Sequence, residues 1–240
     1  MVGNASLLTV LPAHSLRHLH LQQVQGREGP AVSAALARLS NLQQLRIDPL
    51  QLGGPLQLPG RRGAVGSADV TRDRWFLLRE LAVHFPNQGP SNRQWQAILN
   101  GVAASTNLTQ LALYGTCKVD GDNHEGGGLT NLKELSITCS QLLPPGDALA
   151  LTALTGLTRL VLKYNGAGVG DEAATALAGS CQQLRHLDVS YCSLVSMACL
   201  ANVAHLPQLT ELTLGGNSGL TQQGLMLLTG LKQLKHLSFD

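Results

Sequence analysis

The sequence predicts an α/β fold of about nine stacked repeats, each a short strand followed by a helical or looped return segment. Three observations carry this prediction. One apolar motif recurs along the chain, its copies follow one another at a nearly constant interval, and the composition is 44% hydrophobic but only 3% aromatic.

The recurring motif is Leu-x-x-Leu-x-Leu, in which Ile, Val or Phe replaces some of the last leucines. Its nine copies begin at Leu16, Leu42, Leu78, Leu108, Leu132, Leu157, Leu184, Leu209 and Leu234. Successive copies start 24 to 36 residues apart. An apolar motif with a period of about 20 to 29 residues is the signature of a leucine-rich repeat solenoid. We therefore expect a curved horseshoe, with parallel strands on its concave face and helices and loops on its convex face.

Each motif is predicted to form one strand, because alternation of apolar and polar residues in Leu-x-Leu gives a strand with one buried face. A single strand and its return segment cannot bury their leucines alone, so neighbouring repeats must stack. A narrow, repetitive core of this kind is filled by leucine, which accounts for the low aromatic content.

Several return segments carry helix signals. Pro30 suits the first turn of a helix whose apolar residues run to Leu39. Asp171 and Thr221 are predicted to cap the helices that follow them. Ser91 to Gln94 has the form of a capping box in front of another helical segment.

Residues 1–240 are expected to form a single leucine-rich repeat domain. The chain is further expected to be a fragment, because it begins inside a repeat and Asp240 directly follows the ninth motif. The longest interval holds a Gly/Pro-rich stretch, 49–73, in which PLQLGG is nearly repeated as PLQLPG. We expect this stretch to be a looped-out insertion. It is either a partner-binding loop or the product of low-complexity slippage.

Charge and targeting signals exclude several classes of function. The net charge is +2, from 17 basic and 15 acidic residues, which gives no nucleic-acid footprint and no polybasic membrane patch. The first residues lack the form of a signal peptide, and no stretch is long and apolar enough to span a bilayer. We therefore expect a cytoplasmic protein that is a monomer.

No catalytic, cofactor or metal site is predicted. The sequence has no nucleophile elbow, no P-loop and no His-Glu-x-x-His motif. The five cysteines form no Cys-x-x-Cys pair and are expected to pack as small apolar residues. His18 and His20 have a spacing that would allow chelation together with His14, but surface histidines are the favoured interpretation. The chain is expected not to be an enzyme.

One segment resembles a known family of repeats. The run from Cys181 to Cys192 resembles the C-x-x-L-x-x-L-x-L-x-x-C core of the cysteine-containing leucine-rich repeats of F-box ubiquitin-ligase receptors, within the ribonuclease-inhibitor-like superfamily. Asn165, Cys192 and Asn217 occupy the ninth position of their motifs. Their side chains are expected to bond unpaired backbone where the chain leaves the strand. The resemblance implies the leucine-rich repeat fold and does not by itself choose a function.

The remaining candidate is the concave face. Motif positions three, five and seven should form a polar ladder of mixed charge, and all three tyrosines fall at positions seven or eight. Tyrosine is a favoured interface anchor, although these tyrosines would equally pave the edge of a solenoid. The candidate partner-binding residues are Tyr114, Arg159, Lys163, Tyr164, His186, Asp188, Tyr191 and Glu211.

The sequence therefore predicts a non-enzymatic scaffold that binds another protein through its concave face. Two alternatives stay open. The first is the substrate-recognition part of an SCF-type ubiquitin ligase whose F-box lies outside this chain. The second is a structural component of a ciliary axoneme.

Overall fold

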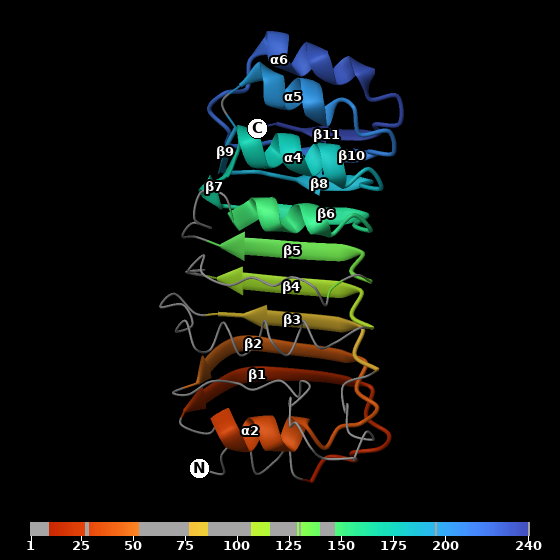
Figure 1. Cartoon of the computed structure of the whole chain (residues 1–240). Coiled ribbons are helices and arrows are strands. Elements are labelled where there is room, and N and C mark those ends of the chain that lie inside the picture. The colour runs from red at the N-terminus through yellow and green to blue at the C-terminus, as the bar shows by residue number, and fades with distance from the viewer. Residues whose placement is uncertain are drawn as a thin grey trace, which may run out of the picture. The chain divides into compact units, whose positions relative to one another are not determined.

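A computed structural model of the chain describes residues 10–26, 29–52, 77–85, 107–115, 129, 131–139, 147–194 and 196–239. One strand of a single sheet arises from each of the nine motifs, as predicted (Figure 1). These strands are β1 (His18–Gly26), β2 (Gln44–Leu52), β3 (Glu80–His84), β4 (Gln110–Gly115), β5 (Glu134–Cys139), β6 (Arg159–Lys163), β8 (His186–Asp188), β10 (Glu211–Thr213) and β11 (His236–Ser238). Their order in the sheet is their order along the chain.

Parallel pairing joins equivalent motif positions in neighbouring strands. Leu160 of β6 pairs with Leu187 of β8, which in turn pairs with Leu212 of β10. These three leucines are at most 4% exposed. Because the side-chain period of a strand is two residues, this register places the leucines at motif positions four and six on the same side of the strands.

The chain divides into two compact units, which we describe separately. Unit 1 comprises Met1–Leu111 and Gly127–Asn131, and unit 2 comprises Ala112–Gly126 and Leu132–Asp240. The single domain expected from the sequence stays a prediction.

In unit 1, helix α2 (Gly29–Leu36) follows β1. It begins one residue before Pro30, which confirms the predicted helix start. Val32, Leu36 and Leu39 are fully or almost fully buried. Strand β2 continues through Leu52 and pairs with β1 as far as Gly26, so the first four residues of the stretch expected to be an insertion belong to a strand. Residues 53–73 lie outside the described residues, as does the predicted capping box at Ser91 to Gln94.

In unit 2, the return segments form a series of short helices on one side of the strands (Figure 1). They are the 3-10 helices η1 (Asp147–Ala153) and η2 (Leu228–Gly230) and the α-helices α4 (Asp171–Ser180), α5 (Met197–Val203) and α6 (Gln222–Leu227). Helix α5 packs between α4 and α6. Leu177, Leu200 and Leu228 are buried, so a leucine from each return segment completes the core that the strands begin.

The helix caps agree only in part with the sequence prediction. Thr221 caps α6, because its hydroxyl accepts a hydrogen bond from the Gly224 amide at 3.1 Å. The prediction for Asp171 is wrong, since Gly170 is the N-cap of α4 and Asp171 is its first residue. An acidic side chain there still faces the positive end of the helix dipole. Ser196 caps α5 by the same kind of bond as Thr221, and the sequence analysis missed it.

A second, two-stranded sheet follows the main strands in unit 2. It pairs β7 (Gly166–Gly170) with β9 (Cys192–Ser193) in parallel. Both strands begin where the chain leaves a motif, so the motifs at Leu157 and Leu184 stay paired beyond their main strands. The motif pattern contains no signal for this pairing.

Candidate protein-binding face

The side of the strands opposite the buried leucines carries motif positions three, five and seven, and we call it the strand face. In unit 2, pairing places the third positions of five strands in one row. The row consists of Glu134, Arg159, His186, Glu211 and His236. Acidic and basic types are mixed along it, as expected for this ladder from the sequence.

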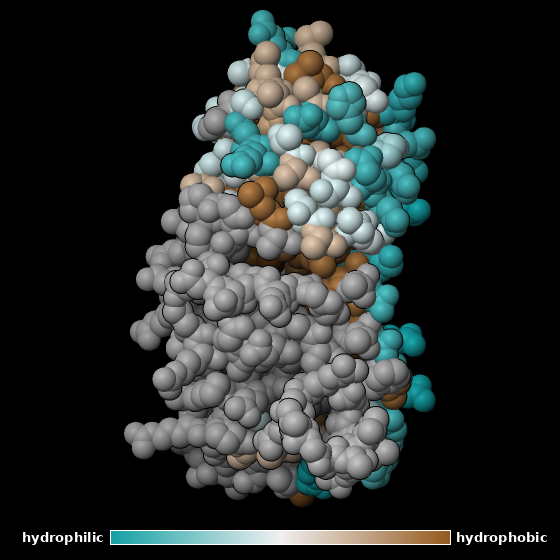
Figure 2. All heavy atoms as spheres, viewed as in Figure 1, coloured by the Kyte–Doolittle hydropathy of each residue, from teal (hydrophilic) through white to brown (hydrophobic). Residues whose placement is uncertain are grey.

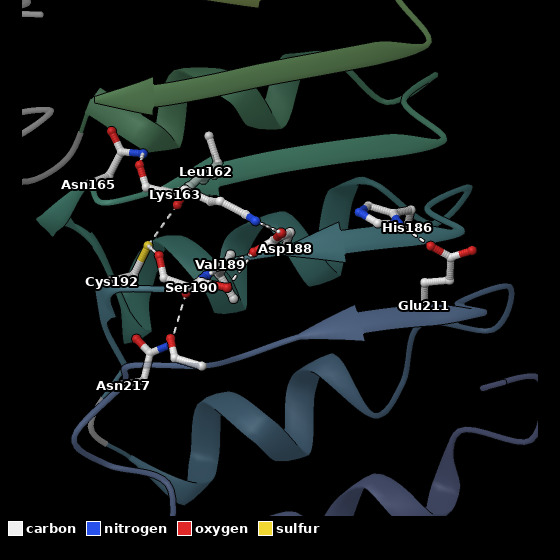
Figure 3. Close-up of polar contacts among 11 residues, drawn as sticks. Leu162, Lys163, Asn165, His186, Asp188, Val189, Ser190, Cys192, Glu211 and Asn217 are labelled. Carbon is white, nitrogen blue, oxygen red and sulfur yellow. Dashed lines mark hydrogen bonds and ion pairs between the residues drawn. The ribbon is translucent and has the colours of Figure 1, made fainter. Parts of the chain in front are cut away.

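Two of the predicted residues form a cross-strand pair within this row. His186 Nδ1 lies 2.5 Å from Glu211 Oε2, and the His186 side chain is only 16% exposed (Figure 3). This hydrogen bond is the main cause of a pKa of Glu211 that lies below its ordinary value. The pair therefore holds the carboxylate in its charged form on the strand face.

The sequence predicts an exposed Asp188 on the binding face, but this residue is buried in the structure. It is 5% exposed, with Oδ1 accepting hydrogen bonds from the amide and the hydroxyl of Ser190 and Oδ2 2.9 Å from Lys163 Nζ (Figure 3). Ser190 and Val161 beside it are also buried. Because both carboxylate oxygens have partners within the chain, Asp188 positions Lys163 and is not available to a partner protein.

Tyr164 and Tyr191 form a stacked pair that remains open to solvent. Their ring centroids are 4.5 Å apart with planes inclined by 13°, and the residues are 48% and 51% exposed. Both have a left-handed backbone, with φ of 58° and 53°. They occupy the eighth motif position, where Gly115 and Gly216 also have positive φ.

The Tyr191 ring packs directly against Gly216. A Cβ atom on Gly216 would lie 2.3 Å from Cδ1 of that ring, which is closer than van der Waals contact allows. The missing side chain of Gly216 therefore lets the ring lie flat against the next repeat. Spacing alone did not reveal this role, because the positive φ at this position already favours glycine.

The remaining predicted residues lie near these pairs without joining them. Tyr114 is 37% exposed on β4, and Arg159 is exposed at the start of β6. Within the described ranges, no hydrogen bond or ion pair links either side chain to the other predicted residues. The structure thus brings six of the eight candidates together as three pairs: Tyr164 with Tyr191, Lys163 with Asp188, and His186 with Glu211.

The ninth motif position forms the predicted backbone ladder behind the strand face (Figure 3). Asn165 donates to the carbonyl of Ile137 at 3.1 Å, the thiol of Cys192 to that of Leu162 at 2.9 Å, and Asn217 to that of Val189 at 2.9 Å. Each acceptor is the sixth position of the preceding motif. This arrangement ties each turn to the strand before it.

The strand face of unit 1 has a small cluster of its own. Asp48 Oδ1 lies 2.6 Å from His84 Nδ1, and Asp48 Oδ2 lies 3.1 Å from a guanidinium nitrogen of Arg46. The hydrogen bond from His84 is the leading cause of a pKa of Asp48 below its ordinary value. Position seven of two consecutive motifs thus pairs across β2 and β3, while Arg46 at position five joins Asp48 within β2. Asp48 and His84 occupy position seven of the predicted ladder, but motif spacing does not predict that they are partners.

Three of the described cysteines are buried packing residues. Cys181, Cys192 and Cys199 are buried, and desolvation raises the pKa of their thiols to about 11, about 12 and about 12. A nucleophilic cysteine needs a lowered pKa, so these three are poor nucleophiles. Among the described residues, no three His, Cys, Asp or Glu side chains converge as metal ligands. In the same part of the chain, no helix has the length and apolar character needed to cross a bilayer.

Comparison with known proteins identifies the fold. No protein-family model matches the sequence, and a search of curated proteins gave no match. Among solved structures, an internalin C2 from Listeria monocytogenes matches with a TM-score of 0.58 and 18% identity, over 93% of this chain and 80% of that one. An internalin (inlF) from the same species matches with a TM-score of 0.55 and 19% identity, over 94% of this chain and 63% of that one.

Internalins are leucine-rich repeat proteins, and identities below 25% show a shared fold without showing a shared function. The matches agree with one parallel strand per motif and with return segments of helices and loops. The chain therefore has the α/β leucine-rich repeat solenoid fold that its motif spacing predicts.

Proposed function

We propose that this chain is a non-enzymatic scaffold that binds another protein through its strand face, with the Tyr164–Tyr191 pair beside that face as the anchor. Leucine-rich repeat neighbours among solved structures support an interaction scaffold as the general class. The tyrosine pair is the observation that points to a particular surface.

The backbone at the tyrosines carries the argument. A left-handed conformation costs a residue with a side chain roughly 1 to 2 kcal/mol, and glycine avoids this cost. Gly115 and Gly216 occupy the same motif position with positive φ, so glycine is compatible with it. Two tyrosines therefore stand where glycine would cost less. Strained residues of this kind concentrate at functional sites.

Stacking between the rings explains only part of their presence. An aromatic pair contributes about 0.5 to 1.5 kcal/mol beyond its buried area, which offsets about one of the two strained residues. About half of each tyrosine nevertheless stays exposed. A partner that covers the pair would bury this apolar area while leaving the hydroxyls available for hydrogen bonds, as is usual for tyrosines at interface hot spots.

The test requires a partner identified with the full chain, followed by affinity measurements on variants. The double variant Tyr164→Ala, Tyr191→Ala should weaken binding by about fivefold or more while the circular dichroism spectrum is unchanged. Met226→Ala is the matched control, because Met226 is 64% exposed on α6, away from the strand face. Hydroxyl-radical footprinting should also show both tyrosines protected in the complex. Unchanged affinity and unprotected tyrosines would overturn the proposal for this surface.

Neither alternative function is favoured by a particular observation in the part of the chain that the structure describes. The substrate-recognition part of an SCF-type ligase and the axoneme component both stay hypotheses from the sequence. The cysteine-containing subtype, the cytoplasmic location, the monomeric state and the absence of enzymatic activity are likewise part of this proposal.

A further inference from the structure

The second motif position alternates between a cation and a neutral residue along the entire chain. The odd motifs carry Arg17, Arg79, Lys133, Arg185 and Lys235, and the even motifs carry Gln43, Thr109, Thr158 and Thr210. Lys and Arg together make up only 17 of 240 residues. Five of them at one motif position, all in alternate motifs, are not expected from random placement. We call the five basic residues the cation column.

In unit 2, backbone hydrogen bonds line up the members of this column. The Lys133 carbonyl accepts from the Thr158 amide at 2.8 Å, and the Arg185 carbonyl accepts from the Thr210 amide at the same distance. The amides of Arg185 and Lys235 in turn donate to the carbonyls of Thr158 and Thr210 at 2.8 Å. Lys133, Arg185 and Lys235 therefore stand two strands apart, at intervals of about 9.6 Å from the usual strand spacing.

The threonines between them have a structural role that the cations lack. The hydroxyl of Thr158 donates to the Lys133 carbonyl at 3.1 Å, and that of Thr210 donates to the Arg185 carbonyl at 2.8 Å. The threonines thus fold back onto the backbone and are half-buried, whereas the three cations are exposed. Cations in every second strand also avoid the repulsion between like charges on adjacent strands.

Most of the column has no partner for its charge. Within the described residues, the side chains of Arg185 and Lys235 make no ion pair, and Lys133 Nζ donates only to the carbonyl of Gly156 at 3.3 Å. In unit 1, Arg17 and Arg79 are exposed, two strands apart and likewise without an ion pair among described residues. Hydrophilic residues gather along the side of unit 2 where the strands begin (Figure 2).

We propose that the cation column of unit 2 binds an acidic polypeptide segment in the polyproline II conformation, with a carboxylate at every third residue. This helix has three residues per turn and rises about 3.1 Å per residue, so every third side chain points the same way at intervals of about 9.3 Å. The carboxylate spacing matches the cation spacing of about 9.6 Å. Seven residues of such a segment span about 19 Å, which is the distance across the four strand gaps from Lys133 to Lys235.

Charge density favours a peptide over a nucleic acid. Duplex DNA carries one negative charge per about 1.7 Å of its axis, far more than one cation per about 9.6 Å neutralises. Glu134 and Glu211 occupy the third position directly beside the column and would repel a continuous row of phosphates. A peptide with neutral residues between its carboxylates brings fewer negative charges near these two glutamates and so meets less repulsion. This surface is separate from the tyrosine pair, so the inference goes beyond the proposed function.

The experiment uses fluorescein-labelled peptides and the full 240-residue chain at low ionic strength. One probe has five Glu-Pro-Pro repeats, and the other has the same composition with the glutamates in adjacent positions. Tighter binding of the regularly spaced peptide is expected. Arg185→Gln should weaken its binding about 2- to 5-fold, as loss of one exposed ion pair usually does. Arg46→Gln is the matched control, because it removes the same charge from the strand face of unit 1.

The triple variant Lys133→Gln, Arg185→Gln, Lys235→Gln should weaken binding by at least about fivefold and flatten its dependence on salt. The double tyrosine variant should bind the peptide normally, which separates this inference from the proposed function. Equal affinity for the two peptides, or equal loss with Arg46→Gln, would overturn it. Tighter binding of a DNA duplex or of heparin through the same three residues would instead make the column a general polyanion site and also overturn it.

Discussion

Tyr191 adopts a backbone conformation that its residue type disfavours. Its φ of 53° suits glycine, so Tyr191→Gly should be more stable than Tyr191→Ala by about 1 kcal/mol, because only the alanine variant retains the left-handed strain. Both variants lose the stacking with Tyr164, which cancels in the comparison. Urea denaturation of the two variants measures the difference. If alanine proved equal to glycine, the argument from strain would fail.

Leu187 is the opposite case, because an apolar side chain occupies a buried position of a strand. It is 4% exposed and pairs with Leu160 on one side and Leu212 on the other. Leu187→Ala should reduce the free energy of unfolding by about 2 to 5 kcal/mol, from lost transfer energy and the cavity left behind. Chemical denaturation gives this value. A loss below about 1 kcal/mol would contradict the assignment of this motif to the core.

At the next level, the ninth-position ladder ties each turn to the preceding strand. Asn217 donates to the carbonyls of Val189 and Leu214, and its Oδ1 accepts from the Leu194 amide at 3.2 Å. Asn217→Ala leaves these three buried groups without partners and should cost at least about 3 kcal/mol, given about 1 to 3 kcal/mol for each unsatisfied group. Asn217→Cys should cost less, because Cys192 fills the same position one repeat earlier. Thermal and urea unfolding of the two variants would show the order, and equal losses would contradict it.

The pair that links β8 to β10 makes a prediction about pH. Because His186 lowers the pKa of Glu211 in the folded chain, the Glu211 carboxylate should titrate below the ordinary value of 4.5. Its stabilising contribution is present above the pKa of the unfolded chain and is lost as the pH falls through the lower, folded pKa. Carbon-13 NMR of the carboxyl group measures the titration. His186→Gln should move the midpoint up toward 4.5, and an unchanged midpoint would mean that another group sets it.

Secondary-structure elements were predictable where a sequence pattern specifies them locally. The nine strands and the Thr221 cap follow from spacing and side-chain chemistry that act locally. Gly170 took the cap position expected for Asp171 because β7 runs directly into α4, and nothing in the motif predicts β7. Asp188 is buried for a similar reason, since its partners Lys163 and Ser190 come from the pairing of strands and a local turn.

For the complete chain, the sequence specified the fold better than the binding surface. A repeat of leucines fixes strand order and register, whereas a binding surface depends on which exposed side chains meet one another. The ladder of polar positions was predictable, but the two pairs within it and the tyrosine pair beside it were not. The stacking of Tyr164 on Tyr191 depends on a backbone conformation that residue identity disfavours, and no residue-level pattern signals it.

The cation column also restricts how a chain of this kind can change in length. Lys133, Arg185 and Lys235 are 52 and 50 residues apart, so the alternation has a period of two motifs. Gain or loss of one motif would place two cations on adjacent strands, or two neutral residues, and would break the regular spacing at that point. Only a duplication or deletion of motif pairs preserves it. Evolution can therefore lengthen or shorten this surface only by two repeats at a time, although each single repeat is a structural unit of the fold.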